Sequence, residues 1–308
     1  MKIVILIQAR MTSSRLPGKV LMDFNFSKKQ KSTFLEYQIR RIQKSKDLDA
    51  QIGVVTTGLS SDDPIKQLCD DLDVYCYRGS EHDVLDRYFN AAKELKADVV
   101  VRITSDCPLV DPNIISRCIN KLVQKNYDFV GSTEPLPTTF PDGMDVSVFT
   151  FSALEDSYQK GLKPSEREHV TFYITENKEN YKIGKIENKV DLSEYRLCID
   201  YPDDVEMIQK IFSHFEEDDN PYLIPMERII EIIDKFDLKN INSSHSFGEG
   251  WQSAFEKDKK SQKVDQNQAN HLDHTKTDLL WEKQVEYIPG GAQTFSKMPN
   301  AHVKGAAP

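Results

Sequence analysis

Apolar runs alternate with amphipathic stretches along the first 240 residues of the chain. Residues 2–7 (KIVILI) are almost continuously aliphatic, which is typical of a strand buried on both faces of a parallel sheet. Further strand-like runs lie at residues 51–57, 74–77 and 97–104. The alternation predicts an α/β fold with a Rossmann-like, mostly parallel sheet and crossover helices.

Between these runs, apolar residues recur at approximately the spacing of a helix face, as Phe34, Tyr37, Ile39 and Ile42 illustrate. Helices are therefore predicted at residues 33–44, 62–72, 84–95 and 112–125, a strand at 127–132, and two closing helices at 202–215 and 225–237.

Residues 133–200 are less regular and contain Pro135, Pro137, Pro141 and Gly143. We expect an insertion here that covers the substrate, with an antiparallel ribbon near residues 145–149. A short strand-like run follows at residues 196–199.

Composition changes after residue 239. Residues 241–276 are rich in Asn, Ser, Lys, Asp and Gln, so we predict a polar linker that buries little. The predicted domains are thus a catalytic domain at 1–240, this linker, and a separate segment at 277–308.

Charge and cysteine content narrow the function classes. A formal net charge of −9 argues against a nucleic-acid surface. No run approaches the roughly 18 apolar residues of a membrane span, so no membrane partner is expected and the cytoplasm is the default location. Five cysteines without C-x-x-C spacing suit reduced thiols better than disulfides or zinc.

The loop after the first strand, IQARMTSSRLPGKVL (residues 7–21), places Arg10, Arg15 and Lys19 at the carboxyl end of a central strand. Ligands bind at that edge of open α/β sheets, and cationic side chains with backbone donors suit an anion. The loop therefore indicates a phosphate site, although it lacks the Walker pattern. The alternative is a solvated basic turn, which would show the same sequence pattern.

This loop, with its A-R-x-x-S-x-R-L-P-G-K pattern, resembles the nucleotide-binding signature of sugar-acid cytidylyltransferases, the CMP-Kdo and CMP-sialic acid synthetase group. TSDCPLVDP, FPDGMDVSVF, REHVTFYI and IDYPDDVEMI follow in the order found in the spore coat polysaccharide biosynthesis protein F branch. The resemblance covers about residues 1–240. It implies the nucleotide-diphospho-sugar transferase fold, with CTP and a sugar as substrates.

The resemblance implies that Asp106 and Asp200 hold a divalent metal, Mg²⁺. Both follow strand-like runs, and Mg²⁺ characteristically takes one or two carboxylates together with phosphate and water oxygens. The alternative is that Asp106 caps the turn before Pro108 and Asp200 caps the helix that begins at Pro202.

The resemblance also implies roles at the nucleotide. Arg15, Lys19 and Asp106 would be catalytic. Ser105 replaces the glycine that the sugar-acid synthetases generally carry, so the resemblance leaves the base and sugar preference open. The expected nucleotide-binding residues are Gln8, Ala9, Arg10, Arg15, Lys19, Thr56, Arg78, Ser80 and Asp106.

For the sugar pocket, the candidates are Asp142, Asp145, Arg167 and His169. Arg167 could hold a carboxylate through two parallel hydrogen bonds. The R-E-H sequence at 167–169 could equally form a surface cap network.

Residues 278–308 resemble the opening of class III pyridoxal-phosphate aminotransferases of the glutamate-1-semialdehyde aminomutase type, through W-E-K, I-P-G-G, Q-T and S-K in order. We therefore expect the chain to be the front of a fusion whose aminotransferase domain is missing. The alternative is a polar tail with a chance match.

The expected function is metal-dependent transfer of CMP from CTP to a sugar, with a sugar acid as the favoured acceptor and with release of pyrophosphate, in surface-glycan synthesis. A glycosyltransferase that uses a nucleotide sugar is one rival interpretation. A non-catalytic nucleotide-binding partner of the fused aminotransferase is another. A homodimer fits the sequence as well as a monomer does, and the sugar and the base stay open.

Overall fold

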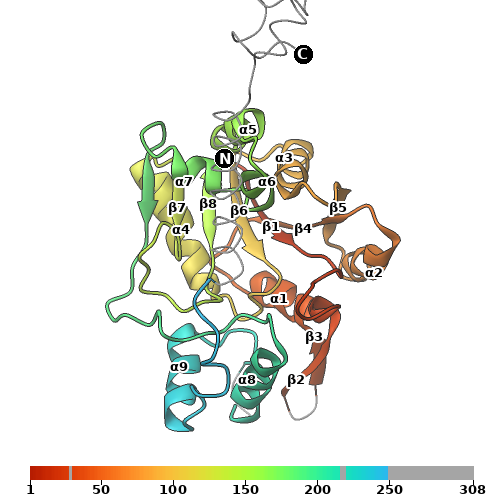
Figure 1. The fold of residues 1–308 in the computed structure, drawn as a ribbon, viewed down its shortest axis with the longest axis vertical. Coiled ribbons are helices and arrows are strands. Elements are labelled where there is room, and N and C mark those ends of the chain that lie inside the picture. Colours follow the sequence, from red (N-terminus) through yellow and green to blue (C-terminus); the bar gives the residue numbers. More distant parts are fainter. Residues whose placement is uncertain (28–29, 216–219, 249–308) are drawn as a thin grey trace, which may run out of the picture. The chain divides into compact units, whose positions relative to one another are not determined.

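A computed structural model describes residues 1–27, 30–215 and 220–248. Within these ranges, one seven-stranded sheet has the strand order β5-β4-β1-β6-β8-β7-β9 (Figure 1). Its first four strands run parallel to one another. They are β5 (Tyr75–Gly79), β4 (Gln51–Thr57), β1 (Ile3–Gln8) and β6 (Val99–Thr104). The predicted Rossmann-like α/β class is confirmed.

Alternate residues of the central strand β1 enter two separate cores, because successive side chains of a strand point to opposite faces. Ile5 and Ile7 pack on one face, and Val4 and Leu6 pack on the other. The first face is covered by α1 (Phe34–Gln43), α2 (Asp63–Asp71) and α4 (Pro112–Lys125), and the second by α3 (Val84–Glu94) and α5 (Phe151–Lys160).

The antiparallel element of the insertion lies within the main sheet. Strand β8 (Ser147–Thr150) pairs antiparallel with β6 on one side and with β7 (Phe129–Gly131) on the other. Val148 and Phe149 are buried in opposite cores, which explains why this short strand is held between two neighbours. Strand β9 (Ile183–Lys185) then adds to β7 in parallel.

The rest of the insertion contains α6 (Pro164–Glu168) and α7 (Phe172–Glu176), which the sequence pattern did not predict. The expected strand at residues 196–199 is reduced to a single parallel bridge between Asp142 and Arg196. This bridge still brings two distant segments together beside the sheet.

A second unpredicted element is a hairpin of β2 (Asp23–Ser27) and β3 (Gln30–Thr33), which packs against α8 (Pro202–Ser213) (Figure 1). Helix α9 (Met226–Lys235) follows. Phe24 stacks on Phe34 and contacts Phe212, so the hairpin and α8 share one aromatic cluster. Phe212 lies near the end of α8, so this cluster holds the helix that follows Asp200 against the hairpin.

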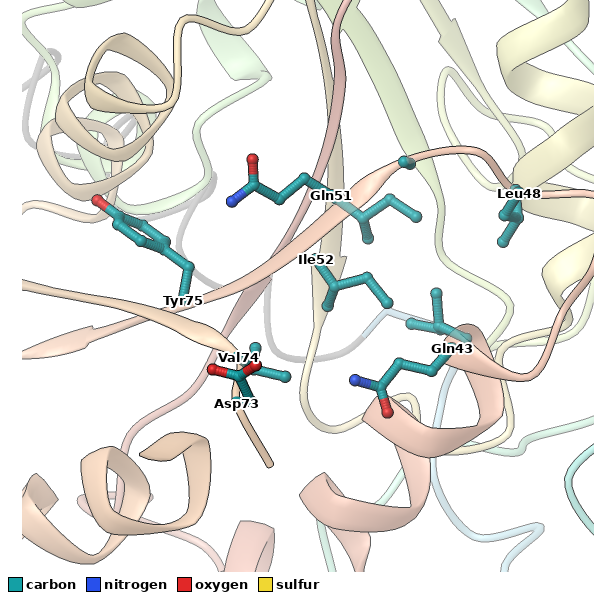
Figure 2. Close-up of a pocket in the computed structure, with 10 residues that line it drawn as sticks. Gln43, Leu48, Gln51, Ile52, Asp73, Val74 and Tyr75 are labelled. Atoms are coloured by element: carbon teal, nitrogen blue, oxygen red, sulfur yellow. The ribbon is translucent and has the colours of Figure 1, made fainter. Parts of the chain in front are cut away.

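A pocket of about 290 Å³ lies at the amino edge of the sheet, where β4 and β5 begin (Figure 2). Its lining is mainly aliphatic and aromatic and includes Ile5, Ile52, Val74 and Tyr75. Asp73 is the charged residue in this lining.

The predicted linker at 241–276 and the segment at 277–308 lie outside the described residues, except for 241–248. Within those eight residues, Asn242, His245 and Gly248 form hydrogen bonds with Asp204, Asp203 and Asp142. The first part of the predicted linker is therefore in contact with the catalytic domain. Among the described helices, none is both long and apolar enough to cross a bilayer.

Candidate active site

The loop after β1 is shaped by backbone contacts that place Lys19 at the sheet edge. The backbone N–H of Met11 donates to Asp62 at 2.8 Å, and that of Gly18 donates to the Met11 carbonyl at 2.9 Å. Gly18 has a φ of +72°, a left-handed conformation that glycine adopts without strain, and it begins the short 3₁₀ turn Lys19–Leu21. Lys19 is thereby turned inward, with its side chain only 9% exposed.

The ammonium of Lys19 lies between the two predicted metal ligands. Its Nζ is 2.7 Å from Asp200 Oδ1 and 3.4 Å from Asp106 Oδ2. The two carboxylates come from residues 94 positions apart, and one cation reaches both. This arrangement brings together three of the residues that the sequence analysis selected.

A backbone hydrogen bond explains how the two aspartates meet. Asp106 follows β6, and its carbonyl accepts the N–H of Ile199 at 2.8 Å. The segment that leads to Asp200 is therefore fastened to the end of β6, and Asp200 lies immediately before α8.

Opposite charges keep Lys19 and Asp106 ionised. Burial alone would lower the pKa of Lys19, but the carboxylates of Asp106 and Asp200 outweigh it and raise that pKa above its usual value. Burial would likewise raise the pKa of Asp106, yet the Lys19 ammonium lowers it below its usual value. The site therefore holds charged groups at neutral pH.

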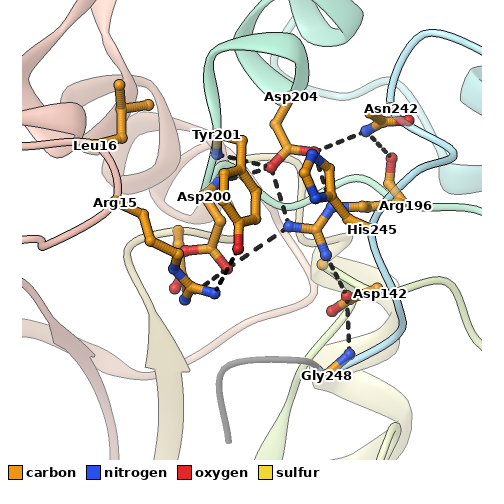
Figure 3. A network of polar contacts seen from close by, with 12 residues as sticks. Arg15, Leu16, Asp142, Arg196, Asp200, Tyr201, Asp204, Asn242, His245 and Gly248 are labelled. Carbon is orange, nitrogen blue, oxygen red and sulfur yellow. Dashed lines mark hydrogen bonds and ion pairs between the residues drawn. The ribbon is translucent and has the colours of Figure 1, made fainter. Parts of the chain in front are cut away.

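Arg15 supplies a second cation. Its Nη2 is 3.1 Å from Asp200 Oδ2, its Nη1 donates to the hydroxyl of Tyr201 at 3.4 Å, and its guanidinium lies 5.2 Å from the centre of the Tyr201 ring (Figure 3). Arg15 and Lys19 thus contact the same carboxylate from two positions of the loop.

Two further predicted residues, Asp142 and Asp145, lie next to Asp106. The Cys107 thiol is 3.4 Å from Asp145 Oδ2 and 3.6 Å from Asp106 Oδ1, so it bridges the two carboxylates. Burial and the neighbouring Asp145 raise the pKa of Asp142 to about 7, despite its ion pair with Arg196 at 2.9 Å. Burial also raises the pKa of Asp145.

Gly143 allows this acidic turn to approach its neighbour. Its φ is +100°, and an added Cβ would lie 2.5 Å from the carbonyl carbon of Leu197 and 2.6 Å from the amide nitrogen of Cys198. No side chain fits at those distances. The residue is therefore required for the turn at 142–145 to pack against the segment that carries Asp200.

The remaining nucleotide candidates lie along the same sheet edge. Gln8 ends β1 and accepts a hydrogen bond from Arg102, and the Ala9 N–H donates to the Val55 carbonyl. Arg10 is partly exposed, 3.9 Å from Glu168. Thr56 is buried on β4 and is paired in register with Arg78 on β5, and Ser80 is exposed just beyond.

Arg78 is engaged within the protein. Its guanidinium donates to the carbonyls of Thr57 and Leu59 and contacts Asp63 at 2.7 Å. These contacts tie β5 to the loop that precedes α2. The structure thus gives Arg78 a role in shaping the edge.

Arg167 and His169 are not gathered with the acidic cluster. The Arg167 guanidinium contacts Asp83 and donates to the Tyr158 carbonyl at 3.0 Å, and its charge lies over the Tyr158 ring. His169 ends α6, and its ring stacks on Phe172. These contacts correspond to the alternative in which the R-E-H sequence stabilises local structure.

Residues that the sequence analysis missed surround Asp200. Arg196 contacts Asp142, Asp200 and Asp204, and His245 stacks on Tyr201 at a ring distance of 3.9 Å (Figure 3). The only signal in the sequence was the group of acidic residues in IDYPDD. It does not reveal which arginine or which later segment would contact them.

The donor set suits a cation that also contacts phosphates. In the described part of the chain, no three His, Cys, Asp or Glu residues are grouped to hold a metal by themselves. Asp106 and Asp200 nevertheless share one ammonium, so both lie within reach of a single positive charge. Mg²⁺ is bound in this way by one or two carboxylates, with phosphate and water oxygens completing its shell.

A Rossmann-like sheet with two carboxylates and loop cations at its carboxyl edge suits an enzyme that binds nucleotides. Residues 4–244 match the cytidylyltransferase family. The chain belongs to this family, and it is a nucleotidyltransferase enzyme. The match ends before the segment at 277–308.

Three known proteins are similar to this chain. The chain is 38% identical over 247 residues to an uncharacterized protein of Methanocaldococcus jannaschii, covering 79% of this chain and 96% of the relative. It is 31% identical to the spore coat polysaccharide biosynthesis protein SpsF of Bacillus subtilis, over 68% of this chain and 86% of that protein. The solved structure of a cytidylyltransferase from Leptospira borgpetersenii is similar, with 35% identity and a TM-score of 0.71, over 79% and 98% of the two chains.

Proposed function

We propose that this enzyme transfers CMP from CTP to a hydroxyl of a sugar, and that Asp106 and Asp200 hold a divalent cation for the reaction. The sugar oxygen forms a bond to the α-phosphorus, the bond from that phosphorus to pyrophosphate breaks, and the hydroxyl proton is released. The likeness to a polysaccharide biosynthesis protein supports a sugar, and we propose a sugar acid, as the acceptor.

One observation carries this proposal: a single ammonium lies within 3.4 Å of two carboxylates at the strand edge where nucleotides bind. A bound divalent cation would neutralise charge on the phosphates. The triphosphate would offer Lys19 and Arg15 new anionic partners, so these side chains would move from the carboxylates to the phosphates.

This movement of Lys19 and Arg15 links the binding of the divalent cation to the binding of CTP. In the present structure, Lys19 and Arg15 neutralise Asp200. A divalent cation that arrives alone must compete with them, whereas a cation that arrives with CTP finds both side chains drawn to phosphate oxygens. We therefore infer that each ligand strengthens the binding of the other.

The acceptor would lie beside Asp142 and Asp145. Asp142 is buried, Asp145 is half-buried and is bridged to Asp106 by the Cys107 thiol, and carboxylates accept hydrogen bonds from sugar hydroxyls. Arg10 extends from the same loop and is exposed enough to contact a ligand.

The test is pyrophosphate release from CTP, UTP, GTP and ATP with a panel of sugars and sugar acids, with and without Mg²⁺. We expect release with CTP, a requirement for both the sugar and Mg²⁺, and loss of activity in Asp106→Asn and Asp200→Asn. Asp191→Asn is the control, because Asp191 is exposed and its Oδ1 accepts the Ser193 N–H, a contact that an asparagine oxygen can keep. Metal-independent release, or full activity in both site variants, would overturn the proposal.

A further inference from the structure

The start of α8 is held by a carboxylate inside the helix. Asp204 Oδ2 accepts the backbone N–H of Asp200 at 2.8 Å and that of Tyr201 at 3.0 Å. Asp204 is fully buried. The backbone of the proposed metal ligand is thus fixed from within the helix.

Arg196 holds the other side of Asp204. Its Nε lies 2.8 Å from Asp204 Oδ1 and its Nη2 lies 3.0 Å from Asp204 Oδ2, a two-point contact (Figure 3). Nη1 reaches Asp142 at 2.9 Å, and Nη2 also lies 3.6 Å from Asp200 Oδ2. One guanidinium therefore contacts three carboxylates of the site.

The segment after α9 completes this network. Asn242 donates its side-chain N–H groups to Asp204 Oδ1 at 2.9 Å and to the Arg196 carbonyl at 3.2 Å. The backbone N–H of Gly248 donates to Asp142 at 3.2 Å (Figure 3). Residues 242–248 thus contact the same carboxylates as Arg196.

We propose that Arg196 is a positioning residue that aims the carboxylate of Asp200 at Asp106, and that residues 242–248 hold Arg196 and Asp204 in place. The inference rests on the proposed function, since it assumes that Asp200 binds the divalent cation.

The geometry requires arginine at this position. A guanidinium is planar and offers five N–H donors in a fixed arrangement, whereas a lysine ammonium is a compact charge on a flexible stem. A lysine at 196 would keep the charge but could not contact Asp142, Asp200 and Asp204 with the same geometry. The carboxylate of Asp200 would then no longer be held by a guanidinium in a fixed position.

The experiment measures Mn²⁺ binding by electron paramagnetic resonance, in the presence of a non-hydrolysable CTP analogue, for the wild-type chain and Arg196→Lys. We expect the Mn²⁺ affinity of the variant to fall by about 10-fold or more, as is typical when a residue that orients a metal ligand is changed. Arg41→Lys is the matched control. Arg41 is another buried arginine, bound to the carbonyls of Val110, Tyr222 and Ile224, so its loss should lower the melting temperature while the Mn²⁺ affinity stays the same.

A second variant keeps the test decisive if Arg196→Lys does not fold. Asn242→Ala leaves every charge in place and removes two hydrogen bonds of the network, so its Mn²⁺ affinity should fall by several-fold. Wild-type Mn²⁺ affinity in a folded Arg196→Lys or, failing that, in Asn242→Ala would overturn the positioning role. No Mn²⁺ binding by the wild-type chain with the CTP analogue would instead overturn the proposed function.

Discussion

The carboxyl edge and the amino edge of the same sheet gather different kinds of side chains. At the carboxyl edge, the Lys19 ammonium lies within 3.4 Å of both Asp106 and Asp200, and the three residues come from three separate segments. The amino edge holds a pocket of about 290 Å³ that is lined by seven aliphatic or aromatic residues together with Gln43, Gln51 and Asp73, of which Asp73 is charged. Because of these converging charges, rather than an available cavity, we propose the carboxyl edge as the active site of this enzyme.

The largest effect is expected from Lys19→Met. The variant removes the cation that we assign to the triphosphate, and loss of one such preorganised contact typically costs on the order of 10²–10³ in rate. The rate of pyrophosphate release at saturating substrate concentrations measures this loss. Lys44→Met, at an exposed position, should keep the wild-type rate. A Lys19→Met enzyme within a few-fold of wild type would remove the carboxyl edge from its catalytic role.

Shortening the chain should have the next largest effect. A chain that ends after residue 240 lacks Asn242, His245 and Gly248, which contact Asp204, Asp203 and Asp142. We expect its Mn²⁺ affinity in the presence of CTP to fall by about 10-fold or more. A chain that ends after residue 254 keeps these contacts and should match the full chain. Equal affinities in the two shortened chains would contradict a contribution of residues 242–248.

A smaller effect is expected in the pH dependence of the stability of the folded state. The pKa of Asp142 is raised from 3.8 to about 7, chiefly by burial, so the folded state holds a proton here that the unfolded chain releases near pH 4. The folded state then binds more protons than the unfolded state between about pH 4 and 7, and stability falls as the pH rises through this window.

Asp142→Asn removes this titration. Its melting temperature should change less than that of the wild type between pH 5 and pH 8, with a difference on the order of a few degrees. Calorimetric scans of both proteins across the window measure it. Parallel melting profiles would show that Asp142 is ionised throughout.

The smallest effect is expected at the amino edge. Gln51→Trp adds bulk to the pocket beside Ile52 and Tyr75, far along the strands from the loop cations. The rate and the apparent affinity for CTP should stay within about twofold of wild type, because Gln51 begins β4 and the proposed site lies at the opposite, carboxyl ends of the strands. A large loss of CTP affinity would mean that the pocket belongs to the site.

The regular part of the fold was predictable because its pattern is local. Strand β4 and helix α4 occupy the predicted ranges, since continuous apolar runs and helical spacing are visible in a single sequence. The hairpin of β2 and β3 was missed because Phe24 is stabilised by Phe34 and Phe212, which are distant partners that no local pattern contains.

The residues of the candidate site divide in the same way, into those that a sequence pattern could select and those that only the folded chain brings together. Lys19, Asp106 and Asp200 stand next to strand ends or turns and could be selected from the sequence. Arg196 could not, because its role depends on carboxylates that meet only in the folded chain. Arg167 shows the converse, since a residue in a suggestive motif contacts Asp83 on a different part of the domain.

The most direct test of the central claim is a Mn²⁺ titration by electron paramagnetic resonance with a non-hydrolysable CTP analogue. The account predicts that the wild-type chain binds Mn²⁺ and that both Asp106→Asn and Asp200→Asn bind it at least about 10-fold more weakly, with melting temperatures within a few degrees of wild type. Wild-type Mn²⁺ affinity in either variant would contradict a cation site shared by the two aspartates.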